Sequence, residues 1–122
     1  FNKDKIGFDM GCGSGRWAKY IAPKVKLLNC IEPSPKALKV AKQNLKEFYN
    51  CKFECASSNS NSLKESSQDF GYCLGVLHHT PNPMLGLKSC VSKLKKAVLF
   101  FYIYTIGLIT DQNGITLFGL VQ

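Results

Sequence analysis

The chain has 122 residues, which is enough for one domain with a modest core. Its 45% hydrophobic content is typical of a globular protein, and no apolar run reaches the roughly 18 residues that a membrane-spanning helix needs. The formal net charge is +8, but Arg16 is the only arginine. Because arginine makes the bidentate contacts that read phosphates and guanine, we expect no specific nucleic-acid partner. The lack of a long apolar run leads us to expect no membrane partner.

Strand-like and helix-like segments alternate along the chain. The apolar run at 6–10 predicts a buried strand, and a helix follows from Ser14 until Pro23 ends it. Ser34 is a plausible N-cap for a second helix, whose apolar stripe reaches Phe48. The other expected strands are 26–31, 52–56, 70–76 and 97–104, and a third helix spans 83–94. This order predicts an α/β fold of three layers, with a parallel sheet between helices.

The six cysteines form no C-x-x-C pair. The two that lie closest in sequence, Cys51 and Cys55, have no second pair and no nearby histidine to complete a zinc site. We therefore expect reduced, unliganded thiols in a cytoplasmic protein, and no metal. The chain starts at Phe1 and enters a strand-like segment almost at once, which indicates a fragment without its natural N-terminus.

A glycine-rich loop follows the first expected strand, in the stretch "IGFDMGCGSGRW". Its glycines are Gly11, Gly13 and Gly15, and Glu32 directly follows the second expected strand. Such a loop lets a ligand approach the backbone, and an acid at that position accepts hydrogen bonds from ribose hydroxyls. The third glycine comes one position too early for the dinucleotide fingerprint, because Arg16 stands there. This favours a ribose-bearing ligand without a pyrophosphate and disfavours an NAD-dependent oxidoreductase.

Three motifs in order resemble the class I S-adenosylmethionine-dependent methyltransferases that act on small molecules. They are "FDMGCGSGRW", "IEPSPKAL" and "SQDFGYCLGVLHHTPNP", and the resemblance covers about residues 4–104. It implies a Rossmann-like fold, with a methyltransferase core at 1–104 and a diverged or irregular tail at 105–122. It also implies S-adenosylmethionine as the cofactor and a small molecule as the methyl acceptor.

The same resemblance implies roles for single residues. Asp9 would orient the loop or the amino group of the cofactor, and Glu32 would bind the ribose hydroxyls. His78 and His79 would be the candidates for a catalytic base. The implied cofactor-binding set is Asp9, Gly11, Cys12, Gly13, Gly15, Glu32, Pro33, Ser34, Ala56, Ser57, Leu74 and Gly75.

The chain departs from the family pattern after Tyr104. Five strands are recognisable, and we expect the last two strands of the family fold to be missing or diverged. The fifth strand would then be an exposed apolar edge, prone to self-association. A non-catalytic module that keeps the cofactor pocket is therefore the alternative to an active enzyme.

Overall fold

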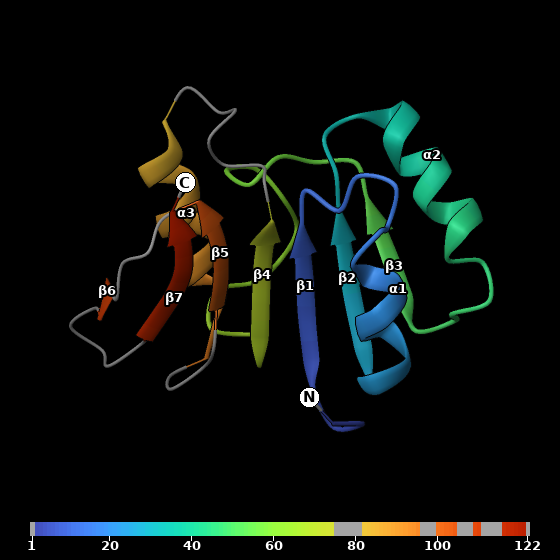
Figure 1. Ribbon diagram of the computed structural model, residues 1–122, viewed down its shortest axis with the longest axis horizontal. Coiled ribbons are helices and arrows are strands. Elements are labelled where there is room, and N and C mark those ends of the chain that lie inside the picture. Colours follow the sequence, from blue (N-terminus) through green and yellow to red (C-terminus); the bar gives the residue numbers. More distant parts are fainter. Residues whose placement is uncertain (1, 75–81, 96–99, 105–108, 111–115, 122) are drawn as a thin grey trace.

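The structure is a computed structural model that describes residues 2–74, 82–95, 100–104, 109–110 and 116–121. Its strands form one sheet in the order β3-β2-β1-β4-β5-β7-β6 (Figure 1). The strands are β1 (Ile6–Met10), β2 (Leu27–Ile31), β3 (Cys51–Glu54), β4 (Phe70–Leu74), β5 (Phe100–Tyr104), β6 (Ile109–Thr110) and β7 (Thr116–Val121). The first five strands pair in parallel, as the alternation of strands and helices predicts.

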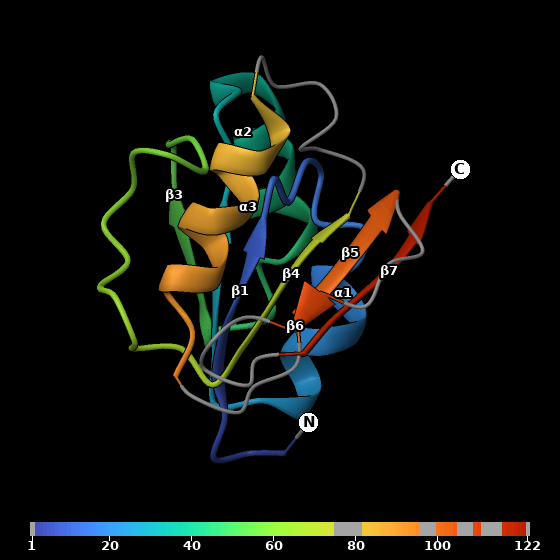
Figure 2. The same ribbon diagram turned by 90° about the vertical axis from the view of Figure 1, so that its left-hand side faces the viewer.

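Helices cover both faces of the sheet (Figure 2). The short helix α1 (Ala18–Ile21), the 3₁₀ turn η1 (Ala22–Lys24) and α2 (Pro35–Asn44) pack on one face, where Leu28 and Leu45 are buried. Helix α3 (Pro83–Ser92) packs on the other face against Phe8 and Met10. The molecule therefore has the three-layer arrangement that the sequence predicts.

The order in which successive strands are added to the sheet reverses at β1. Strands β2 and β3 extend to one side of β1, and β4 and β5 extend to the other. In a doubly wound sheet, the connections leave the carboxyl ends of the two central strands on opposite faces, and this opens a crevice for a ligand. The fold thus places the end of β1, and the glycine-rich loop that follows it, at the position where a ligand binds.

The first two helices differ in length from the prediction for a backbone reason. Helix α1 begins at Ala18 rather than Ser14, because Gly15 has a φ of +84°, which a right-handed helix does not allow. Helix α2 begins as predicted: Pro35 is its first residue, and the Ser34 hydroxyl accepts a hydrogen bond from the Ala37 N–H at 3.3 Å. It ends at Asn44, yet Phe48 still packs against the buried cluster.

The end of the chain corrects one expectation. Strand β7 pairs in parallel with β5 from Phe100 to Tyr104, so β5 is not a sheet edge and the prediction of an exposed edge there was wrong. Strand β6 pairs antiparallel with β7. Two strands follow β5, so of the two forms of the expectation, missing or diverged, the second fits, because β6 is only two residues long.

Asp69 ties the beginning of β4 to β1, at the end of the sheet away from the glycine-rich loop. Its carboxylate accepts a hydrogen bond from the Ile6 N–H at 2.9 Å and pairs with the Lys95 ammonium at 3.0 Å. Desolvation by burial opposes its charge, but these two contacts outweigh it and lower the pKa of Asp69. The residue is structural, as its place at the far end of the strand predicts.

We expect Asp69→Asn to lower the free energy of unfolding by about 1–2 kcal/mol at pH 7, since two charge-assisted contacts are lost. Because the folded pKa lies below the unfolded one, the contribution is present above the unfolded pKa and disappears as the pH falls through the folded pKa. Urea unfolding at pH 7 and pH 2.5 measures this difference. Lys95→Ala is the control, with a loss below about 1 kcal/mol because the side chain of Lys95 is 51% exposed.

Candidate functional site

The glycine-rich loop, residues 11–15, is fixed to the end of β2. The N–H groups of Gly11 and Cys12 both donate to the Ile31 carbonyl, at 2.7 and 3.0 Å. The Gly15 N–H closes the turn by donating to the Cys12 carbonyl at 2.9 Å. The loop is therefore held in shape by backbone contacts at the carboxyl edge of the sheet.

Two glycines in this loop serve different purposes. Gly13 has a φ of +56°, and a Cβ built on it would meet no atom within 4 Å. A Cβ on Gly15 would lie 2.8 Å from Leu45 Cδ1 of the segment after α2. Gly13 therefore leaves open space above the loop, whereas Gly15 allows close packing underneath it.

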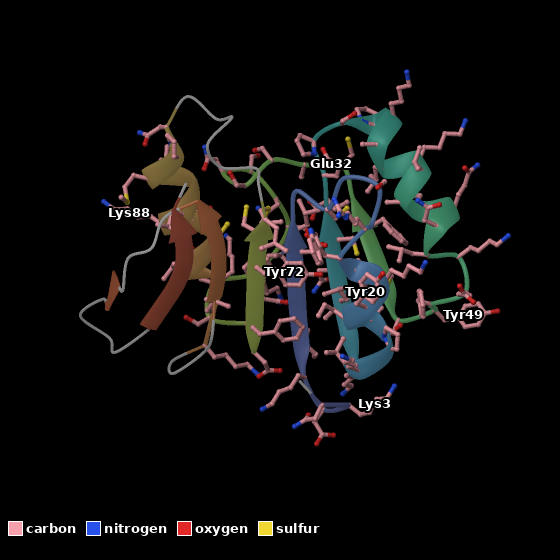
Figure 3. The ribbon with its side chains drawn as sticks, in the orientation of Figure 1. Lys3, Tyr20, Glu32, Tyr49, Tyr72 and Lys88 are labelled. Carbon is pink, nitrogen blue, oxygen red and sulfur yellow. The ribbon has the colours of Figure 1, made fainter. Side chains whose placement is uncertain are left out.

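Glu32 lies at the carboxyl end of β2, next to this loop (Figure 3). Its Oε1 accepts a hydrogen bond from the Gly13 N–H at 3.0 Å, and its Oε2 accepts one from the Ser34 N–H at 2.8 Å. A carboxylate oxygen has two lone pairs, so each oxygen can still accept a further donor. Glu32 thus clamps the loop to the start of α2 and keeps acceptor capacity for a ligand.

Asp9 is the buried acid of the site. It lies on β1 and is 2% exposed, and its Oδ2 has no hydrogen-bond partner among the described residues. The pKa of Asp9 is raised to about 7: burial is the largest cause, the Tyr72 hydroxyl acts in the opposite direction, and the negative charge of Glu32 adds a smaller increase. An orphaned acidic oxygen below a glycine-rich loop is a fitting partner for a cationic ligand group.

The structure brings most of the predicted cofactor-binding residues to one edge of the sheet. The Ala56 N–H donates to the Glu32 carbonyl at 3.2 Å, which places the end of β3 beside Glu32. Pro33 is exposed next to Glu32, and Ser57 is exposed one residue beyond Ala56. Leu74 ends β4 and packs against the cluster under α1 and α2. The predicted residues Gly75, His78 and His79 lie outside the described residues.

Three residues of the site were missed by sequence reasoning. The Asn44 amide donates to the Ser14 carbonyl at 2.9 Å, which ties α2 to the glycine-rich loop. Leu45 packs against Gly15, and Tyr72 faces Asp9 from the neighbouring strand. Only Tyr72 left a signal, as the one hydroxyl-bearing residue of the strand expected at 70–76.

No metal centre is present among the described residues, where no three histidine, cysteine, aspartate or glutamate side chains are grouped to hold an ion. All six cysteines are free thiols, and Cys12, Cys30, Cys73 and Cys90 are buried. Within the same residues, no helix has the length and apolar character to cross a membrane.

Comparison with known proteins identifies the family. Residues 8–102 match the family described as "Methyltransferase domain". The chain belongs to this methyltransferase family. The resemblance inferred from the three sequence motifs is thereby confirmed, and so is the Rossmann-like α/β fold.

Relatives of this methyltransferase domain are distant. The ubiquinone biosynthesis O-methyltransferase of Coxiella burnetii is 26% identical over 115 residues, covering 85% of this chain and 49% of the relative. The solved structure of YcgJ from Bacillus subtilis has a TM-score of 0.76 at 19% identity, and it covers 84% of this chain and 47% of the other. A SAM-dependent methyltransferase from Aquifex aeolicus has a TM-score of 0.70 at 16% identity, covering 78% and 53%. The chain spans about half the length of the curated relatives it matches.

Proposed function

We propose that this methyltransferase domain binds S-adenosylmethionine and transfers its methyl group to a small-molecule acceptor. The observation that carries the proposal is the carboxylate of Glu32, which accepts a hydrogen bond from the Gly13 N–H at 3.0 Å. An acid at the end of β2 then stands beside open space above the loop. Ribose hydroxyls fit such an acid, and the open space fits a ligand that lies against the backbone.

The residues present fit the two ends of the cofactor. Asp9 has an orphaned carboxylate oxygen, which suits the ammonium of the methionine part, directly or through a water molecule. Glu32 would bind the ribose hydroxyls, and Pro33 and Ser34 would lie near the adenine. Ala56 and Ser57 would lie at the adenine edge, with Leu74 and Gly75 near the sulfonium.

The bound cofactor supplies an activated methyl group on a sulfonium, which is transferred by in-line displacement. The protein therefore has to position the two reactants and exclude water rather than activate the methyl group. A base is needed only where the acceptor has to lose a proton, and His78 or His79 would accept it. Curated relatives named as ubiquinone biosynthesis O-methyltransferases support a small-molecule acceptor.

Replacing Glu32 tests the cofactor site. We expect Glu32→Gln to weaken S-adenosylmethionine binding by about 1.5–3 kcal/mol, or roughly 10- to 150-fold. The amide keeps one acceptor but turns an NH₂ group toward a backbone N–H, so it loses both the charge and one of the two clamps. Isothermal titration calorimetry at pH 8 measures the change, with NAD titrated separately into the unmodified chain.

Glu54→Gln is the matched control, because the Glu54 carboxylate also accepts two hydrogen bonds, from the N–H and the hydroxyl of Ser62. We expect it to leave cofactor affinity within about twofold of the unmodified chain, since those contacts lie outside the site. Tight NAD binding without heat from S-adenosylmethionine would overturn the proposal. Cofactor binding without turnover on a broad panel of acceptors would support the non-catalytic module instead.

A further inference from the structure

Tyr72 lies beside the buried acid of the site. Strand β4 pairs in parallel with β1, and the register sets Tyr72 directly opposite Asp9. Residues at paired positions of neighbouring strands project from the same face of a sheet, here the face under α1 and α2. Figure 3 shows Tyr72 on β4, next to β1. Tyr72 is 3% exposed and Asp9 is 2% exposed, so both side chains are shielded from water.

Both side chains end in an unsatisfied polar atom. Among the described residues, neither the Tyr72 hydroxyl nor Asp9 Oδ2 has a hydrogen-bond partner. The ring of Tyr72 packs in an apolar cluster with Leu28 and Phe70, where phenylalanine would pack equally well without a buried hydroxyl. Buried polar groups are normally satisfied, so these two orphaned atoms call for an explanation.

The two groups influence each other electrostatically. The Tyr72 hydroxyl lies near enough to lower the pKa of Asp9, although its oxygen and Oδ2 do not meet as a well-formed hydrogen bond. Burial and the charge of Asp9 raise the pKa of Tyr72 well above its usual value. The phenol therefore stays protonated at neutral pH and acts toward the carboxylate only as a donor.

The other titratable groups around Asp9 do not take this role. Glu32, from the end of β2, raises the pKa of Asp9 because it is also an acid. On the neighbouring strands, hydrogen bonds with the Cys12 and Cys51 thiols, together with burial, raise the pKa of Cys30, so this thiol stays neutral. The pKa of Cys51 is lowered by its hydrogen bond with Cys30. The ion pair of the described residues joins Lys95 to Asp69, at the other end of β4.

We propose that Tyr72 is a positioning residue for the cofactor: its hydroxyl, which faces Asp9 from the neighbouring strand, favours the charged form of this carboxylate and orients it toward the ligand's ammonium, and cofactor binding at neutral pH releases the proton that part of the Asp9 population still holds. The proposal rests on the proposed function and assigns Tyr72 no contact with the reacting atoms. In the complex, the positive charge of the ligand's ammonium balances the negative charge of the Asp9 carboxylate. No such cationic partner is present for Asp9 among the described residues of the free chain. The ligand binds the form of the protein in which Asp9 is charged. The apparent affinity is therefore proportional to the fraction of molecules with a charged Asp9.

The first test is a carbon-13 NMR titration of the Asp9 carboxyl in the cofactor-free chain, with the signal assigned by its loss in Asp9→Asn. We expect a midpoint near the pKa of about 7 in the unmodified chain and about one unit higher in Tyr72→Phe, since a donor to the carboxylate is lost. Tyr49→Phe removes the same atom from a ring that is 98% exposed, and it should leave the midpoint unchanged.

The second test is calorimetry with S-adenosylmethionine at several pH values, in buffers of different ionisation enthalpy. At pH 7 the unmodified chain should release about half a proton on binding, and Tyr72→Phe nearly a whole one. The dissociation constant of Tyr72→Phe should be about fivefold higher at pH 7 and nearly equal at pH 9. In the Asp9→Asn background, the ratio of the dissociation constants with and without Tyr72→Phe should not change with pH.

The outcomes separate this proposal from the function on which it rests. No binding by the unmodified chain would overturn both. Binding with the same ratio of dissociation constants at every pH would overturn the role of Tyr72 and leave the proposed function intact. An unchanged Asp9 midpoint in Tyr72→Phe would overturn the role of Tyr72 as well.

Discussion

Asp9→Asn is expected to make the cofactor-free chain more stable and to weaken its binding of S-adenosylmethionine. The pKa of Asp9 rises from about 3.9 in the unfolded chain to about 7 in the folded one. Between these values the folded state binds more protons, so the free energy of unfolding falls as the pH rises from about 4 to about 7. A neutral amide of the same size removes this penalty, which amounts to at most about 4 kcal/mol above pH 7.

Urea unfolding of both proteins from pH 4 to pH 8 measures this effect. The two curves should coincide near pH 4, where the acid is protonated, and separate toward pH 8 with the variant more stable. Affinity for S-adenosylmethionine at pH 8 should fall by roughly 10- to 150-fold, because a charged contact to the ammonium is lost. Asp4→Asn removes an exposed carboxylate and should change neither quantity. If the free energies of unfolding of the two proteins differed by the same amount at every pH, the raised pKa of Asp9 would not be the cause of the difference.

Asp9 is thus expected to lower the stability of the free chain while it contributes to cofactor affinity. Such a combination is typical of a residue in a functional site. Folding alone does not explain an acid on a central strand that is only 2% exposed and has an unpaired carboxylate oxygen among the described residues. The same reasoning applies to Tyr72, whose hydroxyl adds nothing to the packing of its cluster. Both residues therefore point to a ligand that completes their hydrogen bonding and charge.

Apolar periodicity was enough to predict the central part of the fold. The strand at 6–10 matches β1 residue for residue, and the N-cap at Ser34 starts α2 as expected. The length of α1 was not predictable, since it depends on the backbone conformation of Gly15. The place of β7 beside β5 was not predictable either, because this parallel pairing depends on the arrangement of the whole sheet and leaves no periodic signal in the segment itself.

The candidate site was predictable where a motif determines backbone geometry. The glycine-rich loop and Glu32 belong to two motifs that end neighbouring strands, so the order of strands alone brings them together. The Asn44 amide at the end of α2 and the Leu45 side chain just after it contact the loop, and spacing along the sequence does not encode such contacts. Tyr72 lies opposite Asp9 because of the register between β4 and β1. That register depends on the packing of the whole sheet rather than on the residues next to Tyr72.

Gly15→Ala is expected to damage folding, whereas Gly13→Ala is expected to damage binding. At Gly15 the φ of +84° costs an alanine about 1–2 kcal/mol. The added methyl would also lie 2.8 Å from Leu45 Cδ1. Leu45 is 1% exposed inside its cluster, so moving it disturbs other buried side chains, and this overpacking adds about 1–3 kcal/mol. Chemical denaturation should therefore show a loss of about 2–5 kcal/mol.

Gly13→Ala provides the matched comparison, since it adds the same methyl group two residues earlier in the same loop. Its φ of +56° again costs about 1–2 kcal/mol, but the new Cβ meets no atom within 4 Å. The methyl group would stand in the open space assigned to the cofactor, so we expect at least about a tenfold loss of S-adenosylmethionine affinity in calorimetry. Unchanged affinity in a folded Gly13→Ala would show that the ligand lies elsewhere. Equal stability losses in the two variants would show that Leu45 yields to the added methyl, and that Gly15 is not required for packing beneath the loop.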